Sequence, residues 1–173
     1  MLTRPTFPPL ITALLAVATG LLLGAGHAPM GVWPATIAGV ALFTWLMAEL
    51  RGRAAFGWGY LVGLALNTLT VAWVSVLGVW VAVALIAFMS LWWGLLGLVV
   101  SRLVRLRAWP FLVPAAVVAV EYGSGKIPFG GFPWTRLAFT TIDQPMNGYL
   151  SWVGMTGVSY LVALVACLLL WAV

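Results

Sequence analysis

The run Val79-Trp-Val-Ala-Val-Ala-Leu-Ile-Ala-Phe-Met-Ser-Leu-Trp-Trp-Gly-Leu-Leu-Gly-Leu-Val-Val-Ser101 contains no charged side chain. A helix needs about 20 apolar residues to cross the roughly 30 Å of hydrocarbon in a bilayer. Inside lipid every backbone N–H and C=O must be paired, and a helix pairs them within one segment. The run therefore predicts a transmembrane helix.

Further apolar runs lie on both sides of this segment. They predict an all-α membrane protein, a polytopic bundle of about six transmembrane helices in a single domain. The expected helices cover residues 10–26, 33–48, 56–77, 79–101, 109–121 and 149–173. The fifth has the shortest apolar run, and Pro110 and Pro114 mark its entry, so we expect a short or re-entrant helix there.

Composition excludes a soluble domain. The 173 residues are 64% hydrophobic and 6% charged, whereas soluble domains carry about 25% charged residues. Eight Lys and Arg residues outnumber three acidic ones, but they are scattered between apolar runs and form no basic face for nucleic acid. The single cysteine, Cys167, lies in an apolar run and cannot pair within the chain.

The positive charges predict the orientation of the bundle, because short cytoplasmic loops collect Lys and Arg. Placing both termini in the cytoplasm puts most of these residues inside: Arg4, Arg51, Arg53, Arg102, Arg105 and Arg107. The segment 122–148 then lies outside and carries only Lys126 and Arg136.

Packing between the helices is expected to use small and polar residues, since lipid supplies no hydrophobic drive between helices. Gly20 with Gly24, and Gly59 with Gly63, have the GxxxG spacing that lets two backbones approach. Asn67 lies mid-span, where an amide is expected to hydrogen-bond to a neighbouring helix.

Glu121 is the best candidate for a functional ionisable residue, because a charged side chain at membrane depth is costly. It ends the fifth predicted helix and opens the most Gly- and Pro-rich stretch in the chain. Two interpretations stay open: an ion pair with Lys126 or Arg136 or solvation at the interface, and a role in handling substrate.

Other polar residues receive structural interpretations. His27 has no second His and no Cys or carboxylate at metal-ligand spacing, so we expect no metal and no cofactor. Glu49, beside Arg51 and Arg53, is expected to be a solvated loop charge. Asp143 is expected to cap a turn before Pro145.

The segment Gly130-Gly-Phe-Pro-Trp134 combines glycines, which permit unusual backbone angles, with Pro133, which restricts one. Phe132 and Trp134 present apolar faces. Such a loop suits contact with acyl chains, and it equally suits a rigid outer turn anchored by aromatic residues, so physical arguments leave both open.

Several motifs together resemble a known family. Gly26-His-Ala-Pro-Met-Gly-Val-Trp-Pro34, Glu121, Gly131-Phe-Pro-Trp134, Asp143-Gln-Pro145 and Val153-Gly-Met-Thr-Gly-Val-Ser-Tyr-Leu161 occur in this order. Their order and spacing resemble the membrane part of apolipoprotein N-acyltransferase, a bacterial enzyme of the cytoplasmic membrane. Members of that family often carry an Arg soon after the Glu, where this chain has Gly123 and Ser124.

The resemblance implies a multi-pass protein of the bacterial inner membrane that takes part in acyl transfer. The implied partners are a phospholipid acyl donor, a diacylated lipoprotein and membrane lipids, without nucleic acid. In that family a Glu-Lys-Cys triad in a nitrilase-like domain performs the chemistry. We expect this domain to be absent from the chain, so no catalytic residue is carried over.

The site that the resemblance implies for this chain is a substrate-binding border formed by Glu121, Phe132, Pro133 and Trp134. The chain alone is then expected to be inactive and to depend on the missing nitrilase-like domain or on a partner enzyme. The alternative is a non-catalytic membrane scaffold that stabilises a partner lipid-modifying enzyme. A transporter fits less well, because neither repeated halves nor paired mid-membrane charges occur.

Overall fold

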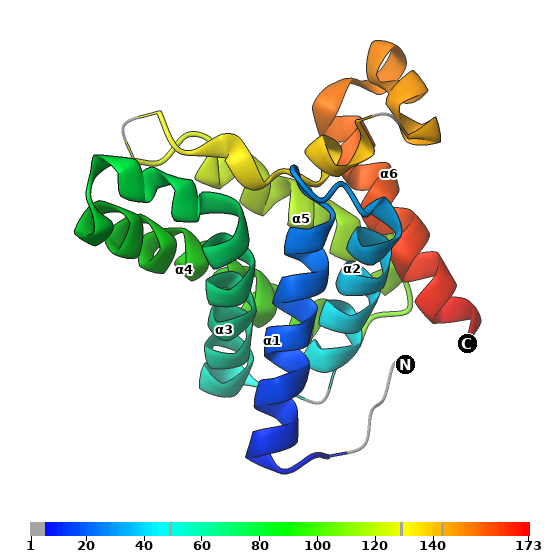
Figure 1. Ribbon diagram of the computed structural model, residues 1–173. Helices are drawn as coiled ribbons and strands as arrows, with labels where there is room; N and C mark the ends of the chain where they lie inside the picture. The colour runs from blue at the N-terminus through cyan, green and yellow to red at the C-terminus, as the bar shows by residue number, and fades with distance from the viewer. Residues whose placement is uncertain (1–5, 49, 129, 143) are drawn as a thin grey trace.

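The computed structural model describes residues 6–48, 50–128, 130–142 and 144–173, and every regular element within them is a helix (Figure 1). This confirms the predicted all-α fold. The elements are α1 (Pro9–Ala25), α2 (Trp33–Met47), α3 (Gly52–Val71), η1 (Ala72–Leu77), α4 (Val79–Leu103), α5 (Trp109–Ser124), η2 (Pro133–Thr135), η3 (Leu137–Thr141), η4 (Pro145–Tyr149) and α6 (Leu150–Ala172).

The helix ends agree with the predicted ranges to within a few residues. The largest difference is at α3, which begins at Gly52 and continues into the 3₁₀ helix η1. The fifth helix, α5, has 16 residues, three more than the expected range, and α2 with 15 residues is the shortest of the α-helices. Pro114 lies inside α5, where it cannot donate to the carbonyl of Pro110 and weakens the helix near its entry.

The apolar helices of the bundle fall into two groups by length. Among the described residues three segments are long and apolar enough to cross a membrane: Gly52–Leu77, Val79–Leu103 and Pro145–Ala172. The helices α1 and α2 are apolar but shorter, with 17 and 15 residues. These lengths lie at or just below the lower end of the range of about 17–25 residues for a spanning helix.

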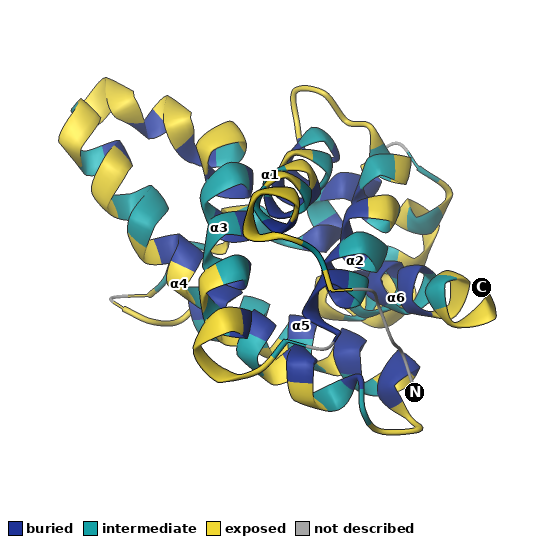
Figure 2. Cartoon of the chain, turned by 90° about the horizontal axis from the view of Figure 1, so that it is seen from below, coloured by how far each residue is buried: buried dark blue, intermediate teal, exposed yellow. Residues whose placement is uncertain are grey.

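The six α-helices form a ring. In order around it, α3 packs on α1, α1 on α2, α2 on α6, α6 on α5, α5 on α4, and α4 on α3. Figure 2 shows this order from below, with buried residues on the inner faces of the helices. Phe43 of α2 and Trp93 of α4 meet edge to face in the core, with ring centroids 5.3 Å apart.

Glycines set the closest contacts in the ring. A Cβ on Gly59 would lie 2.6 Å from the carbonyl oxygen of Trp93, and a Cβ on Gly63 would lie 2.8 Å from the Trp93 Cβ. Gly20 lies equally close to the backbone of α3 at Val62. The predicted packing through GxxxG pairs is therefore confirmed, and so is the predicted bond of Asn67, whose Nδ2 donates to Ser90 Oγ at 3.3 Å.

Two parts of the chain project from the ring. One is the end of the α3–η1–α4 hairpin, where Val76 and Trp80 are exposed (Figures 1 and 2). The other is the segment before Gly154, where Trp152 is 86% exposed. Gly154 has φ 64° and ψ −179°, which kinks α6 and turns this segment away from the remainder of the helix.

Candidate functional site

The Glu121 carboxylate joins three elements. Its Oε1 accepts a hydrogen bond from the backbone N–H of Leu137 in η3 at 2.7 Å. The hydroxyl of Ser159 in α6 also hydrogen-bonds to the carboxylate, and its oxygen accepts from the N–H of Ala138 at 3.0 Å. Glu121 therefore ties the segment after Trp134 to α5 and α6.

The charged neighbours of Glu121 behave differently from one another. The positive charge of Arg136 acts on the carboxylate. Lys126 instead lies over the ring of Tyr122, with Nζ 5.8 Å from the ring centroid. Of the two cations considered from the sequence, Arg136 is the one whose charge contributes at Glu121.

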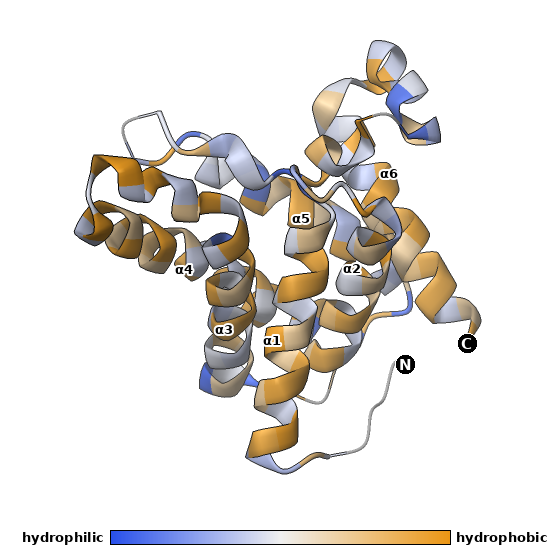
Figure 3. Ribbon diagram, in the orientation of Figure 1, coloured by the Kyte–Doolittle hydropathy of each residue, from blue (hydrophilic) through white to orange (hydrophobic). Residues whose placement is uncertain are grey.

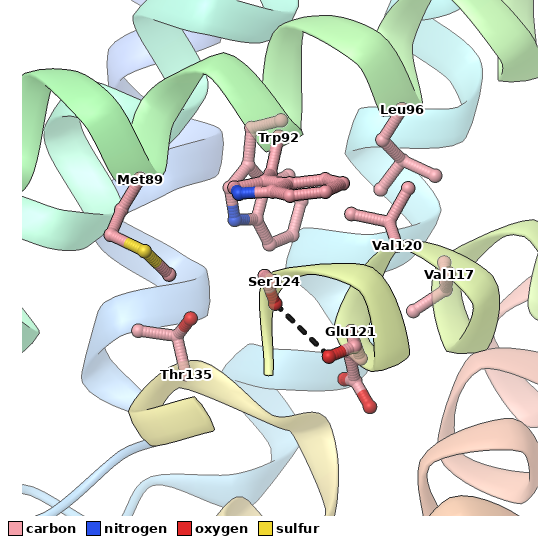
Figure 4. Close-up of a pocket in the computed structure, with 9 residues that line it drawn as sticks. Met89, Trp92, Leu96, Val117, Val120, Glu121, Ser124 and Thr135 are labelled. Carbon is pink, nitrogen blue, oxygen red and sulfur yellow. Dashed lines mark hydrogen bonds between the residues drawn. The ribbon is translucent and has the colours of Figure 1, made fainter. Parts of the chain in front are cut away.

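A small cavity of about 20 Å³ borders Glu121, with room for about one water molecule. Figure 4 shows Met89 and Trp92 of α4 on one side of it and Glu121 and Ser124 of α5 on the other. Ser124 Oγ donates to the backbone carbonyl of Glu121 at 3.0 Å. This cavity is too small for an organic substrate.

The segment Gly130–Trp134 is held against the end of α5. Gly131 has φ 74°, and a Cβ there would collide with the backbone of Ser124, Gly125 and Lys126. The N–H of Phe132 donates to the carbonyl of Ser124 at 2.8 Å. The expected special backbone angles are thus present, and only glycine fits at position 131.

The two aromatic residues of this segment face the end of the α3–η1–α4 hairpin. Phe132 packs against the buried cluster formed by Val71, Val74 and Ala82. The ring of Trp134 meets that of Trp73 edge to face at 5.6 Å and lies 6.0 Å from the ring of Phe132. Trp134 itself is 55% exposed, so one face remains available.

A cavity of about 340 Å³ lies beside Trp134. Its lining comes from the turn after α1, the end of α3 with η1, and the segment from Trp134 onward. The lining residues are His27, Ala28, Thr70, Trp73, Trp134, Phe139 and Ile142. Its size falls in the range of about 300–1,000 Å³ found for ligand pockets.

His27 is the most buried polar group in this lining, with 5% exposure. Its Nδ1 lies 3.0 Å from the carbonyl oxygen of Leu23, so Nδ1 carries the proton and Nε2 is an acceptor. Burial lowers the pKa of His27, which keeps the ring neutral. The backbone of Thr135 and Arg136 lies nearby, yet Nε2 has no hydrogen-bond partner among the described atoms.

The structure brings the predicted site residues together only in part. Phe132 and Trp134 lie in contact, and Pro133 is exposed between them. Glu121 contacts the following turn, at Leu137, rather than the aromatic pair. Sequence reasoning missed the pairing of His27 with Trp134 in one cavity, because only the fold brings the first turn and the later segment together.

Two sequence interpretations cannot be compared with the structure, because Glu49 and Asp143 lie outside the described residues. Within the described part of the chain no group of three or more His, Cys, Asp or Glu side chains could hold a metal ion. Cys167 is buried in α6 and hydrogen-bonds to the side chain of Thr44. The arrangement suits binding of an apolar ligand more than covalent chemistry.

Comparison with known proteins agrees with the resemblance noted from the motifs. A family model described as the apolipoprotein N-acyltransferase N-terminal domain matches residues 19–168. The match includes most of the helical ring, Glu121, and the segment Gly130–Trp134.

Curated relatives named apolipoprotein N-acyltransferase match most of the chain. The protein of Pseudomonas syringae pv. tomato is 28% identical over an alignment of 183 positions, which includes 97% of this chain and 35% of the relative. That of Methylococcus capsulatus is 32% identical over 177 residues, covering 91% of this chain and 34% of the relative. The chain thus spans about a third of the length of the curated relatives it matches.

Proposed function

The chain belongs to the apolipoprotein N-acyltransferase N-terminal domain family, and we propose that it forms the membrane part of an enzyme that acylates lipoproteins. In the proposed reaction an acyl chain leaves a phospholipid ester and forms an amide with the α-amine of a diacylglyceryl-cysteine. The freed glycerol oxygen takes up the proton that the amine loses. The proposed location is the bacterial cytoplasmic membrane.

The cavity beside Trp134 is the observation that carries this proposal. It is partly open, and aromatic and aliphatic residues dominate its lining. Removing a methylene group from water is worth about 0.8 kcal/mol, so an apolar chain is favoured there over a polar ligand. In the proposed function the cavity holds part of an acyl chain of the phospholipid donor or of the lipoprotein.

The four residues selected from the sequence take two roles in this proposal. Trp134 lines the cavity and is the surface proposed to touch the acyl chain, while Phe132 and Pro133 lie beside it outside the lining, with the Phe132 ring 6.0 Å from that of Trp134. Glu121 is a positioning residue. Its bond to Leu137 holds η3, and η3 supplies Phe139 to the lining of the cavity.

The chemical step is proposed to reside in a nitrilase-like partner domain. A thiol nucleophile needs an activating neighbour and access to substrate, whereas Cys167 is fully buried within α6. We therefore expect no acyl transfer when the purified 173-residue chain is given a phospholipid and a diacylated lipopeptide. Turnover above the protein-free background, measured by mass spectrometry of the lipopeptide, would contradict this.

Photo-crosslinking tests the proposed binding site. The chain is placed in vesicles that contain a phospholipid with a diazirine in its acyl chain, and the labelled peptides are identified after irradiation. We expect label at Trp73, Trp134 and Phe139, and a severalfold reduction in the variant Trp134→Ala. The variant Trp152→Ala is the matched control, because this tryptophan is also exposed but lies outside the cavity.

The pattern of labelling distinguishes binding of an acyl chain in the cavity from general contact between exposed side chains and lipid. Labelling that follows exposure alone, with Trp152 marked as strongly as Trp134 and no effect of Trp134→Ala, would contradict the proposed site. Competition by unlabelled phospholipid at Trp134 and not at Trp152 supports it.

A further inference from the structure

The ends of α3 and α4 opposite to the cavity carry a group of arginines. The two helices run antiparallel in close contact, since a Cβ on Gly97 would lie 2.5 Å from the carbonyl oxygen of Ala55. About one turn further out, α3 begins beside Arg51 and Arg53 and α4 reaches Arg102 near its end. This register places the three cations at the same end of the helix pair.

Arg105 joins the turn between α2 and α3 to the end of α4. Its Nη2 donates to the carbonyl of Leu50 at 3.2 Å, and its Nε donates to the carbonyl of Ser101 at 3.1 Å. Arg107 follows in the loop before α5. We call these five residues the arginine surface: Arg51, Arg53, Arg102, Arg105 and Arg107. All except the half-buried Arg105 are exposed, and Figure 3 shows a strongly hydrophilic stretch at the lower end of α3, where this surface begins.

The positive charge of the arginine surface has little compensation in the described part of the chain. Glu121, the described carboxylate, lies near the far end of α5, about 18 Å along the helix from its start at Trp109. Glu49 lies outside the described residues. Arg51 precedes the first residue of α3 and Arg53 lies in its first turn, where the positive end of the helix dipole disfavours cations. An anion bound there would balance the positive charge of the arginines and would interact favourably with the helix dipole.

We propose that the arginine surface binds the phosphate headgroups of anionic phospholipids. Guanidinium groups match phosphate through paired hydrogen bonds. The outer face of α4 next to Arg102 presents exposed Leu95 and Val99, along which the acyl chains of the same lipid can lie. A lipid satisfies both the charged end and this apolar face, whereas free phosphate satisfies only the first. This inference does not depend on the proposed acyl transfer.

Lipid binding to the whole chain tests the proposal. The protein is purified in an uncharged detergent, and the binding of phosphatidylglycerol and of phosphatidylcholine is measured by native mass spectrometry. We expect tighter binding of phosphatidylglycerol. The double variant Arg51→Gln/Arg53→Gln should lower that affinity roughly tenfold or more, since each basic residue near an anionic surface contributes about fivefold.

Matched variants distinguish lipid binding at the arginine surface from a general effect of the protein's net charge. Lys126→Gln removes one positive charge at the opposite end and should change binding by less than Arg51→Gln does. Arg51→Lys/Arg53→Lys keeps the charge but loses the paired hydrogen bonds, so it should bind phosphatidylglycerol more weakly than the unmodified chain and more tightly than the glutamine double variant. It also shows that the positions tolerate substitution. Equal effects of Arg51→Gln and Lys126→Gln, no preference for phosphatidylglycerol, or displacement of the lipid by inorganic phosphate at equal concentration would overturn the proposal.

Discussion

Glu121 shows how a carboxyl group in an apolar helical bundle is held chiefly by hydrogen bonds, with the charge of Arg136 adding to them. One oxygen accepts the Leu137 N–H, and the Ser159 hydroxyl binds the same group. Charged side chains in membrane segments commonly pair or serve function. Here the pairing is with a backbone N–H and a hydroxyl, so the residue anchors the segment that carries Trp134.

Removing the Glu121 side chain should destabilise the fold. Glu121→Ala leaves the Leu137 N–H without its acceptor, and an unsatisfied buried donor costs about 1–3 kcal/mol. Glu121→Gln keeps an acceptor oxygen and should lose less. Thermal unfolding of the purified protein in detergent measures the difference.

The Ser159 hydroxyl provides the control for this prediction. Because Ser159 and Glu121 share one network, the effects of Ser159→Ala and Glu121→Ala should be non-additive in a double-mutant cycle. Full additivity, or equal losses in Glu121→Gln and Glu121→Ala, would mean that the network does not hold the segment.

His27 makes stability depend on pH. Burial lowers its pKa below the ordinary 6.5, so below pH 6.5 the unfolded chain binds a proton that the folded chain does not. The contribution of His27 is therefore complete above pH 6.5 and is lost as the pH falls, at up to about 1.4 kcal/mol per pH unit. Unfolding midpoints between pH 7.5 and 5.5 should fall more steeply for the unmodified chain than for His27→Gln, and parallel curves would refute the assignment.

Among the helices, α3 and α4 depend on glycine for their close approach. Gly59→Ala would place a Cβ 2.6 Å from the carbonyl oxygen of Trp93. The two helices must then separate, and such overpacking costs about 1–3 kcal/mol. We expect a lower unfolding temperature for Gly59→Ala and for Gly97→Ala.

Gly57 is the matched control in the same helix. A Cβ there has open space within 4 Å, and alanine favours a helix by about 1 kcal/mol over glycine. Gly57→Ala should therefore be neutral or slightly stabilising. If Gly57→Ala and Gly59→Ala had the same effect, the close contact would not matter for stability.

Helix positions were predictable because apolar runs report where the chain meets lipid. The start of α3 was less predictable, since Gly52 and Arg53 are helical although the apolar run begins later. Hydropathy marks the edge of the membrane, whereas a helix can continue into the polar region. The kink at Gly154 was also missed, because an isolated glycine in an apolar run does not specify its backbone angles.

At the scale of the whole chain, some features of the candidate site are predictable from the sequence and others are not. Glu121 stood out because carboxylates are rare in apolar runs. Its partner Ser159 and the cavity shared by His27 and Trp134 join distant parts of the chain, and no local pattern encodes such contacts. The glycines and aromatics of 130–134 were recognised as unusual, but the cavity beside them needed the folded ring.

The separation of charge along the bundle predicts its orientation in the membrane. The arginine surface lies at one end, and the cavity and Glu121 lie at the other. Because basic residues collect on the cytoplasmic side, the cavity should open outward. In a Cys167→Ser background, a cysteine at exposed Ile127 should react with a membrane-impermeant maleimide on intact cells, and one at exposed Leu106 should react only after the membrane is disrupted. The reverse pattern would place the arginines outside, and the proposed cavity would then face the cytoplasm.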